Sequence, residues 1–207
     1  MPGPPDARRV LVSARVYSAL QRALGAARVR RVLVAEHLRP APGERVLDLG
    51  CGPGDVRAEL PAVEYVGVDH SERYLAAARA RHAGRGRFVR ADLRLLRLED
   101  EEPFDAAIAI GVLHHLDDGE GAAMLASAAH ALKSSGRLIT IDPALGDRES
   151  PLARWLILRD RGRHLRSSEG YAGLARGRFD HVVASTRHDL ARVPYCHAIL
   201  ECTEPRP

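Results

Sequence analysis

The sequence has little of what defines several other classes of protein. Its 207 residues include only three cysteines, Cys51, Cys196 and Cys202, without the spacing of a metal site. We therefore expect reduced thiols, no disulfide scaffold and no bound metal. No stretch approaches the roughly 18 apolar residues of a membrane helix, and residues 1–10 lack the apolar run of a signal peptide. These absences predict a cytoplasmic protein that does not enter a membrane.

Lysine is also scarce, because Lys133 is the only one among 31 basic residues. The net charge of +4 is carried by arginines spread along the chain. This spread indicates that the arginines lie on solvent-exposed surfaces, and it makes a nucleic-acid partner unlikely. The densest basic run is RDRGRHLR, residues 159–166. The planar guanidinium groups of arginine suit a carboxylate or a phosphate, so this run could bind an anionic small molecule. A solvated loop whose charges pair with one another is the alternative.

Strand-like and helix-like patterns alternate between residues 44 and 143. A helix is expected after Gly54, another over 71–83, and a third that Asp117 and Glu120 open as a variant capping box and Gly136 closes. Two further strand patterns, without a long helix between them, end the chain. The pattern predicts an α/β fold, doubly wound and Rossmann-like, with a mostly parallel seven-stranded sheet and an antiparallel C-terminal pair. The expected strands cover 44–50, 64–69, 86–92, 104–113, 137–142, 178–190 and 195–204.

The stretch VLDLGCGPGD, residues 46–55, predicts a ligand-binding turn after the first strand. Gly50 and Gly52 fit the first two positions of the dinucleotide fingerprint, but Asp55 stands where the third glycine belongs, which argues against NAD. No Gly-Lys-Ser/Thr follows, which argues against an ATP-binding P-loop.

The turn from Asp48 to Gly54 resembles the first motif of the class I S-adenosylmethionine-dependent methyltransferases, and the likeness covers residues 44–143. The resemblance implies that S-adenosylmethionine is the cofactor and S-adenosylhomocysteine the product. It implies that Asp48 faces the amino-acid part of the ligand, that Asp69 faces the ribose, and that Asp92 follows the third strand near the adenine. The full expected cofactor set is Asp48, Gly50, Cys51, Gly52, Gly54, Asp69, His70, Asp92, Leu93 and Gly111.

His114 and His115 directly follow the fourth strand, where a general base for an alcohol or a phenol would be useful. Lining of the cofactor pocket and helix capping are the alternatives for this pair. The acceptor is expected to lie between an N-terminal helical lid, residues 1–40, and the segment 144–207, all in one domain. The candidate substrate residues are Tyr17, Arg159, Arg161, Tyr171 and Tyr195, with core packing as the alternative for Tyr17.

The expected function is methyl transfer to a small molecule, by a monomer or a homodimer, with the acceptor atom open. One alternative is a tRNA or rRNA methyltransferase. The stretch from Gly111 to His114 lacks the Asn/Asp-Pro-Pro-Tyr type of motif found in many nucleic-acid enzymes. The other alternative is a protein that binds adenosylmethionine without transferring its methyl group.

Overall fold

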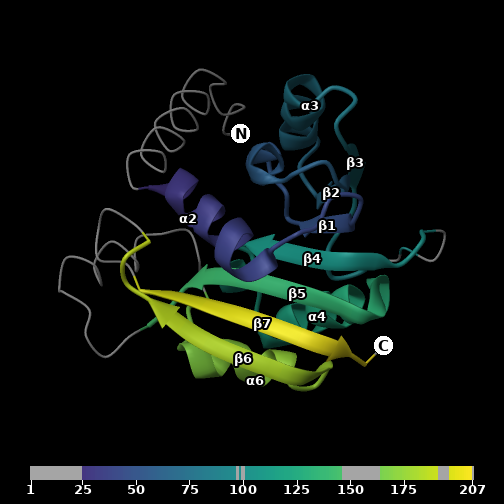
Figure 1. Cartoon of the computed structure of the whole chain (residues 1–207). Helices are drawn as coiled ribbons and strands as arrows, with labels where there is room; N and C mark the ends of the chain where they lie inside the picture. The colour runs from purple at the N-terminus through teal and green to yellow at the C-terminus, as the bar shows by residue number, and fades with distance from the viewer. Residues whose placement is uncertain (1–24, 97, 99–100, 146–163, 191–195, 207) are drawn as a thin grey trace, which may run out of the picture.

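The computed structural model describes residues 25–96, 98, 101–145, 164–190 and 196–206. One seven-stranded sheet runs through it in the order β3-β2-β1-β4-β5-β7-β6 (Figure 1). Strands β1 to β5 pair in parallel, and β7 runs antiparallel to both β5 and β6. The predicted doubly wound α/β fold and its antiparallel C-terminal pair are confirmed. The strands are β1 (Arg45–Leu49), β2 (Glu64–Asp69), β3 (Arg87–Arg90), β4 (Phe104–Ile110), β5 (Leu132–Pro143), β6 (Phe179–Arg187) and β7 (His197–Pro205).

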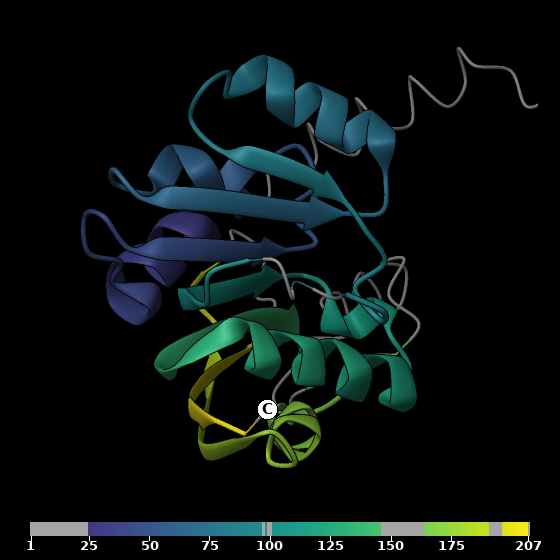
Figure 2. The ribbon, with the colours of Figure 1, turned by 90° about the vertical axis from the view of Figure 1, so that its right-hand side faces the viewer.

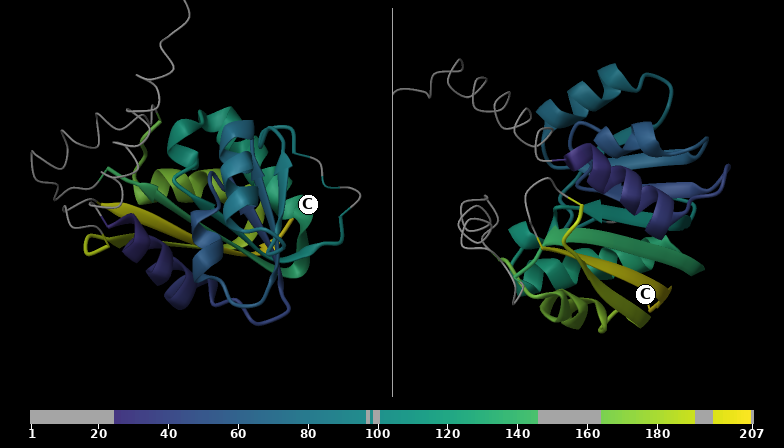
Figure 3. Two further views of the ribbon diagram at one scale, coloured as in Figure 1. Left: turned by 90° about the horizontal axis from the view of Figure 1, so that it is seen from above. Right: turned by 60° about the vertical axis from the view of Figure 1, so that its left-hand side comes forward.

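Helices cover both faces of the sheet, as Figures 2 and 3 show. One buried cluster contains side chains of α2 (Ala26–Val32), of the π-helical turn η1 (Leu33–Leu38) and of α3 (Glu72–Arg81). The other cluster contains side chains of α4 (Asp118–Ala131) and α6 (Ser168–Ala175). None of the described helices has the length and apolar character that crossing a bilayer requires.

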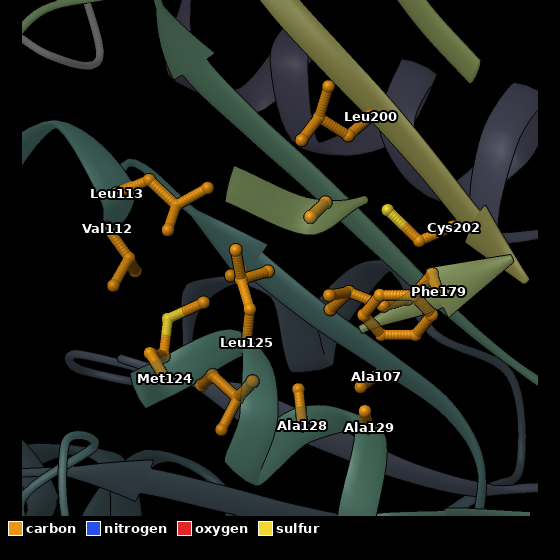
Figure 4. Close-up of a cluster of buried hydrophobic side chains, with 14 of the residues drawn as sticks. Ala107, Val112, Leu113, Met124, Leu125, Ala128, Ala129, Phe179, Leu200 and Cys202 are labelled. Atoms are coloured by element: carbon orange, nitrogen blue, oxygen red, sulfur yellow. The ribbon is translucent and has the colours of Figure 1, made fainter. Parts of the chain in front are cut away.

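Small side chains bring α4 close to the sheet (Figure 4). Ala128 of α4 and Ala107 of β4 are fully buried, and Leu125 and Phe179 fill the space beside them. A chain with 4% aromatic residues thus builds its core mostly from aliphatic groups. Truncating Leu125 to alanine would cost about 2–5 kcal/mol of unfolding free energy, through lost burial and the cavity left behind.

The start of α4 was predicted correctly, and its end was not. Asp117 accepts a hydrogen bond from the Glu120 amide at 2.8 Å, and the Glu120 carboxylate accepts one from the Asp117 amide at 3.2 Å, which completes the capping box. The helix then ends at Ala131, because the buried Leu132 is already extended and pairs with Phe104 as the first residue of β5.

Gly136 therefore does not close a helix. Phe104 pairs with Leu132, while Ala106 pairs with Arg137, so residues 133–136 form an irregularity within β5. A Cβ atom on Gly136 would lie 2.8 Å from the Lys133 carbonyl oxygen. The backbone comes too close here for a side chain, which explains why the residue is glycine.

The helix expected after Gly54 is only a short 3-10 helix, η2 (Asp55–Glu59). Arg57 is buried there, and its guanidinium donates hydrogen bonds to the carbonyl oxygens of Arg85, Leu60 and Pro61. This arginine ties the chain that follows the glycine turn to the loop before β3.

Candidate functional site

The turn after β1 depends on glycine for both its backbone conformation and its packing. Gly50, Gly52 and Gly54 have φ angles of 73°, 53° and 72°, a region that side chains disfavour. A Cβ atom on Gly50 would lie 2.7 Å from Cγ2 of Val112, whereas one on Gly52 would meet nothing within 4 Å. The turn is therefore packed tightly on the side of β4 and has open space at Gly52, where a ligand could approach the backbone.

Asp48 is a buried carboxyl group directly before this turn. It pairs with Gly67 across the β1–β2 ladder, and the Tyr65 hydroxyl donates a hydrogen bond of 2.5 Å to its Oδ2 atom. Burial raises the pKa of Asp48 to about 7, the nearby charges of Asp69 and Asp55 add to the increase, and the Tyr65 hydrogen bond opposes it. A cation at this carboxylate would offset the cost of its burial, so Asp48 fits the ammonium group of an amino-acid ligand.

Asp69 ends β2 and connects the glycine turn to the start of α3. Its Oδ2 atom accepts the Gly52 amide at 2.9 Å, and Oδ1 accepts the Ser71 amide at 2.8 Å. Ser71 occupies the N-cap position, but its side chain makes no capping hydrogen bond. The His70 side chain is mostly exposed, with Nδ1 3.5 Å from Asp69 Oδ1. The structure thus brings Asp69, the predicted ribose-side residue, beside the turn.

The chain after β3 comes back toward the same turn. The half-buried Leu93 has its Cδ1 atom 3.7 Å from where a Cβ on Gly50 would lie. Asp92 accepts hydrogen bonds from the Arg94 side chain and amide, and these lower the pKa of Asp92 to about 2. Asp92 is therefore a charged carboxylate, bound to Arg94, at the edge of the site.

Cys51 lies within the turn and has a packing role. Its side chain is buried, and a Cβ atom on Gly67 would lie 2.8 Å from its sulfur. Burial, followed by the nearby charges of Asp48 and Asp69, raises the pKa of the thiol, so it stays protonated and unreactive.

The histidine pair lies at the end of β4, in the 3-10 turn η3 (Leu113–His115). The His114 backbone amide and its Nδ1 atom lie 3.1 Å and 2.8 Å from the same atom, Oδ1 of Asp142. His114 is 4% exposed, Asp142 is fully buried, and the His115 ring centroid lies 3.9 Å from that of His114. Because a carboxylate accepts, Nδ1 carries the proton, which leaves Nε2 with the lone pair that a base needs. Gly111, with a φ of 65°, opens this turn.

Sequence reasoning missed two partners of these groups, Tyr65 and Asp142. Each interrupts a buried, apolar strand, β2 or β5, in which a polar side chain needs a partner. That signal could have found both residues, although not the groups to which they bind.

The predicted substrate residues are only partly described. Tyr17, Arg159, Arg161 and Tyr195 lie outside the described residues. The Tyr171 ring is 1% exposed, and its hydroxyl donates to the Pro143 carbonyl at 2.9 Å. Burial also raises the pKa of Tyr171. This placement argues against contact with an acceptor, because the ring belongs to the core and the hydroxyl already has a partner.

In the described part of the chain, no three His, Cys, Asp or Glu side chains form a possible metal site.

Comparison with known proteins shows what the segment around this site is similar to. Residues 46–136 match the family model described as a methyltransferase domain. An O-methyltransferase of Pyrenophora dematioidea is 33% identical over 122 residues, which cover 55% of this chain and 45% of the relative. A demethylmenaquinone methyltransferase of Clavibacter sepedonicus is 36% identical over 114 residues, 53% of this chain and 45% of the relative. The matched regions span about half the length of these curated relatives.

Solved structures share the fold over most of this chain. A TehB-like S-adenosylmethionine-dependent methyltransferase from Corynebacterium glutamicum superposes with a TM-score of 0.65 at 17% identity, covering 93% of this chain and 98% of the other. The cyclase SpnF gives a TM-score of 0.68 at 18% identity, covering 87% and 82%. The fold is that of the class I S-adenosylmethionine-dependent methyltransferases, and a cyclase shares it.

Proposed function

We propose that the protein transfers the methyl group of S-adenosylmethionine to a small-molecule acceptor and leaves S-adenosylhomocysteine. The observation that carries the proposal is the open glycine turn flanked by two carboxyl groups, Asp48 and Asp69, inside the segment that matches the methyltransferase domain. When bound, the cofactor supplies a methyl group activated by a positively charged sulfur.

The residues of the turn would hold the cofactor by complementary contacts. Asp48 would bind the ammonium group and become charged as it does so. Asp69 would accept hydrogen bonds from the ribose while keeping the Gly52 amide in place. Leu93 and Asp92 would lie beside the adenine, and the missing side chain at Gly52 would leave room for the ligand.

We propose a hydroxyl group of a small molecule as the acceptor, and the names of several relatives support this choice. The Pyrenophora protein and a Penicillium expansum protein are named O-methyltransferases. In the present chain, His114 would receive the hydroxyl proton at Nε2 while Asp142 holds the proton on Nδ1 and stabilises the resulting imidazolium. His115, whose ring contacts that of His114 at a tilt of 40°, would line the same pocket. Gly111 would line the cofactor side.

The test follows the label from methyl-labelled S-adenosylmethionine into small-molecule and macromolecular fractions of a cell extract. We expect label in the small-molecule fraction with wild type, and transfer slowed by about 10²- to 10⁴-fold in His114→Gln and Asp142→Asn. His181→Gln is the matched control, because His181 is exposed and its Nε2 atom lies 3.3 Å from Glu204. It should transfer like wild type.

Two other outcomes would replace the proposal. Label found only in macromolecules and released by ribonuclease would identify an RNA methyltransferase. Tight binding of S-adenosylhomocysteine with no transfer to either fraction would favour another reaction in the same fold, for which the likeness to a cyclase is the motivating observation.

The organisation around this reaction is also part of the proposal. Residues 1–40 would form a helical lid, 44–143 the cofactor-binding core and 144–207 the acceptor side, within a single domain that acts as a monomer or a homodimer. Arg159 and Arg161 would bind an anionic group of the acceptor, and Tyr17 and Tyr195 would contact it. The buried thiols of Cys51, Cys196 and Cys202 suit a cytoplasmic protein.

A further inference from the structure

Arg166 is the last residue of the basic run 159–166, for which the sequence suggested an anionic ligand. In the structure its guanidinium turns inward, and the side chain is only 11% exposed. This arginine therefore has a task inside the protein.

The guanidinium of Arg166 binds the histidine turn on both sides of the histidine pair. Nη1 donates to the carbonyl oxygens of Leu113 at 3.1 Å and His164 at 2.9 Å. Nη2 donates to the Leu116 carbonyl at 2.9 Å and to Asp118 Oδ1 at 2.7 Å, and Nε donates to the same carboxylate oxygen at 2.9 Å. All the donors of the side chain are engaged, and three of the acceptors belong to the turn and to the first residue of α4.

The backbone around Arg166 is itself fixed against the end of β5. Arg166 forms a parallel bridge with Ala144, and its carbonyl accepts the Leu145 amide at 3.0 Å. Its guanidinium lies 5.6 Å from the centroid of the buried Tyr171 ring, whose hydroxyl is bound to Pro143. The arginine is therefore held by the same strand end that carries Asp142.

The histidine turn has few hydrogen bonds of its own. The His115 amide donates to Val112 and the Leu116 amide donates to Leu113, at 3.0 Å and 3.1 Å. Further hydrogen bonds reach the turn from distant segments, including the His164 amide, which donates to the His114 carbonyl at 3.0 Å. The position of the His114 ring over Asp142 thus depends on groups that are distant in the sequence.

We propose that Arg166 is a positioning residue: by binding carbonyl groups before and after the histidine pair, it keeps Nδ1 of His114 on Asp142. Lysine cannot replace it fully, because the three N–H donors of an ammonium group share one nitrogen. They cannot reach all the acceptors that the planar guanidinium group contacts. The consequence for the reaction rests on the proposed role of His114 as the base, whereas the positioning itself does not.

The test observes the His114 Nδ1 proton directly by nuclear magnetic resonance, so it needs no acceptor. A hydrogen-bonded, slowly exchanging ring N–H signal is expected in wild type, assigned by its loss in His114→Gln. We expect it to disappear in Arg166→Gln, and to remain in Arg166→Lys with solvent exchange faster by about tenfold or more. Arg176→Gln is the matched control, since Arg176 forms an exposed pair with Glu169 on α6. It should keep the wild-type signal.

Thermal unfolding of each variant separates positioning from loss of the fold. If Arg166→Gln does not fold, Arg166→Lys and Asp118→Asn decide, because each keeps part of the network and both should give faster exchange. A wild-type signal in folded Arg166→Gln, or wild-type exchange in both milder variants, would overturn the inference.

Methyl transfer provides a second, separate readout. We expect kcat of Arg166→Gln to fall by about 10- to 100-fold, because misplacement of a catalytic group is costly, while affinity for S-adenosylhomocysteine stays within about twofold. If wild type transfers no methyl group but the ring signal still depends on Arg166, the proposed function fails and the positioning stands. If wild type is active and Arg166→Gln changes neither signal nor kcat, only the positioning fails.

Discussion

The glycine turn after β1 and the histidine turn after β4 lie at the same edge of the sheet, but they are held in different ways. The first depends on backbone conformations that only glycine adopts easily, and the end of β2 accepts hydrogen bonds from its backbone amides. The second opens at a single glycine, Gly111, and is held by a buried carboxylate and an arginine from segments far along the chain. The comparison teaches that the proposed cofactor side is encoded locally, whereas the proposed acceptor side is encoded by long-range contacts.

The largest effect should come from breaking the glycine turn. Gly50→Ala combines a φ of 73° with a contact of 2.7 Å to Val112. We expect it to lower the free energy of unfolding by about 2–4 kcal/mol and to abolish measurable binding of S-adenosylhomocysteine. Gly84→Ala is the control, with a φ of 72° but no neighbour within 4 Å. It should cost about 1–2 kcal/mol and leave binding intact. Wild-type binding by a folded Gly50→Ala would contradict this account of the turn.

A smaller effect is expected from Asp69→Ala. Removal of its carboxylate should weaken S-adenosylhomocysteine binding by about 1–3 kcal/mol, through lost charge-assisted hydrogen bonds to the ribose and a less restrained Gly52 amide. Isothermal titration calorimetry measures this difference. Asp92→Ala, at a carboxylate already paired with Arg94, should weaken binding less. Equal losses in the two variants would remove the special role given to Asp69.

The same contrast explains what could be predicted from the sequence. The alternation of strands and helices, the glycine turn and the place of Asp69 at the end of the second strand follow from short patterns, because each motif lies within a few residues of the strand that positions it. Asp142 and Arg166 could not be assigned, since their partners are 28 and 53 residues away for the contacts with His114 and Leu113. The end of α4 was also misjudged, because the pairing of Leu132 with β4 outweighs the glycine signal that follows it.

The smallest effect should come from Tyr65→Phe. The ring stays packed, 5.6 Å from the Phe88 centroid, but the hydrogen bond that favours the charged form of Asp48 is lost. The pKa of Asp48 should rise further above its ordinary range, and affinity for S-adenosylhomocysteine near neutral pH should fall by about two- to tenfold. The loss should shrink at higher pH, where the carboxyl is charged in both proteins. Tyr74→Phe, at an exposed position on α3, is the control and should bind like wild type.

Asp48 provides the most direct test of the cofactor site. Its pKa is raised from 3.8 to about 7, so the folded protein holds a proton here that the unfolded chain releases, and stability of the ligand-free protein should fall as pH rises between these two values. A bound ammonium group reverses the preference, because it favours the charged carboxylate.

The decisive measurement is therefore calorimetric titration of wild type and Asp48→Asn with S-adenosylhomocysteine at about pH 6 and about pH 8, in buffers of different ionisation heat. We predict that wild type binds more tightly at the higher pH and releases close to one proton at the lower pH, while Asp48→Asn binds weakly and without this proton release. Binding by wild type with neither pH dependence nor proton release, or equal affinity in both proteins, would contradict the assignment of Asp48 as the partner of the cofactor's ammonium group.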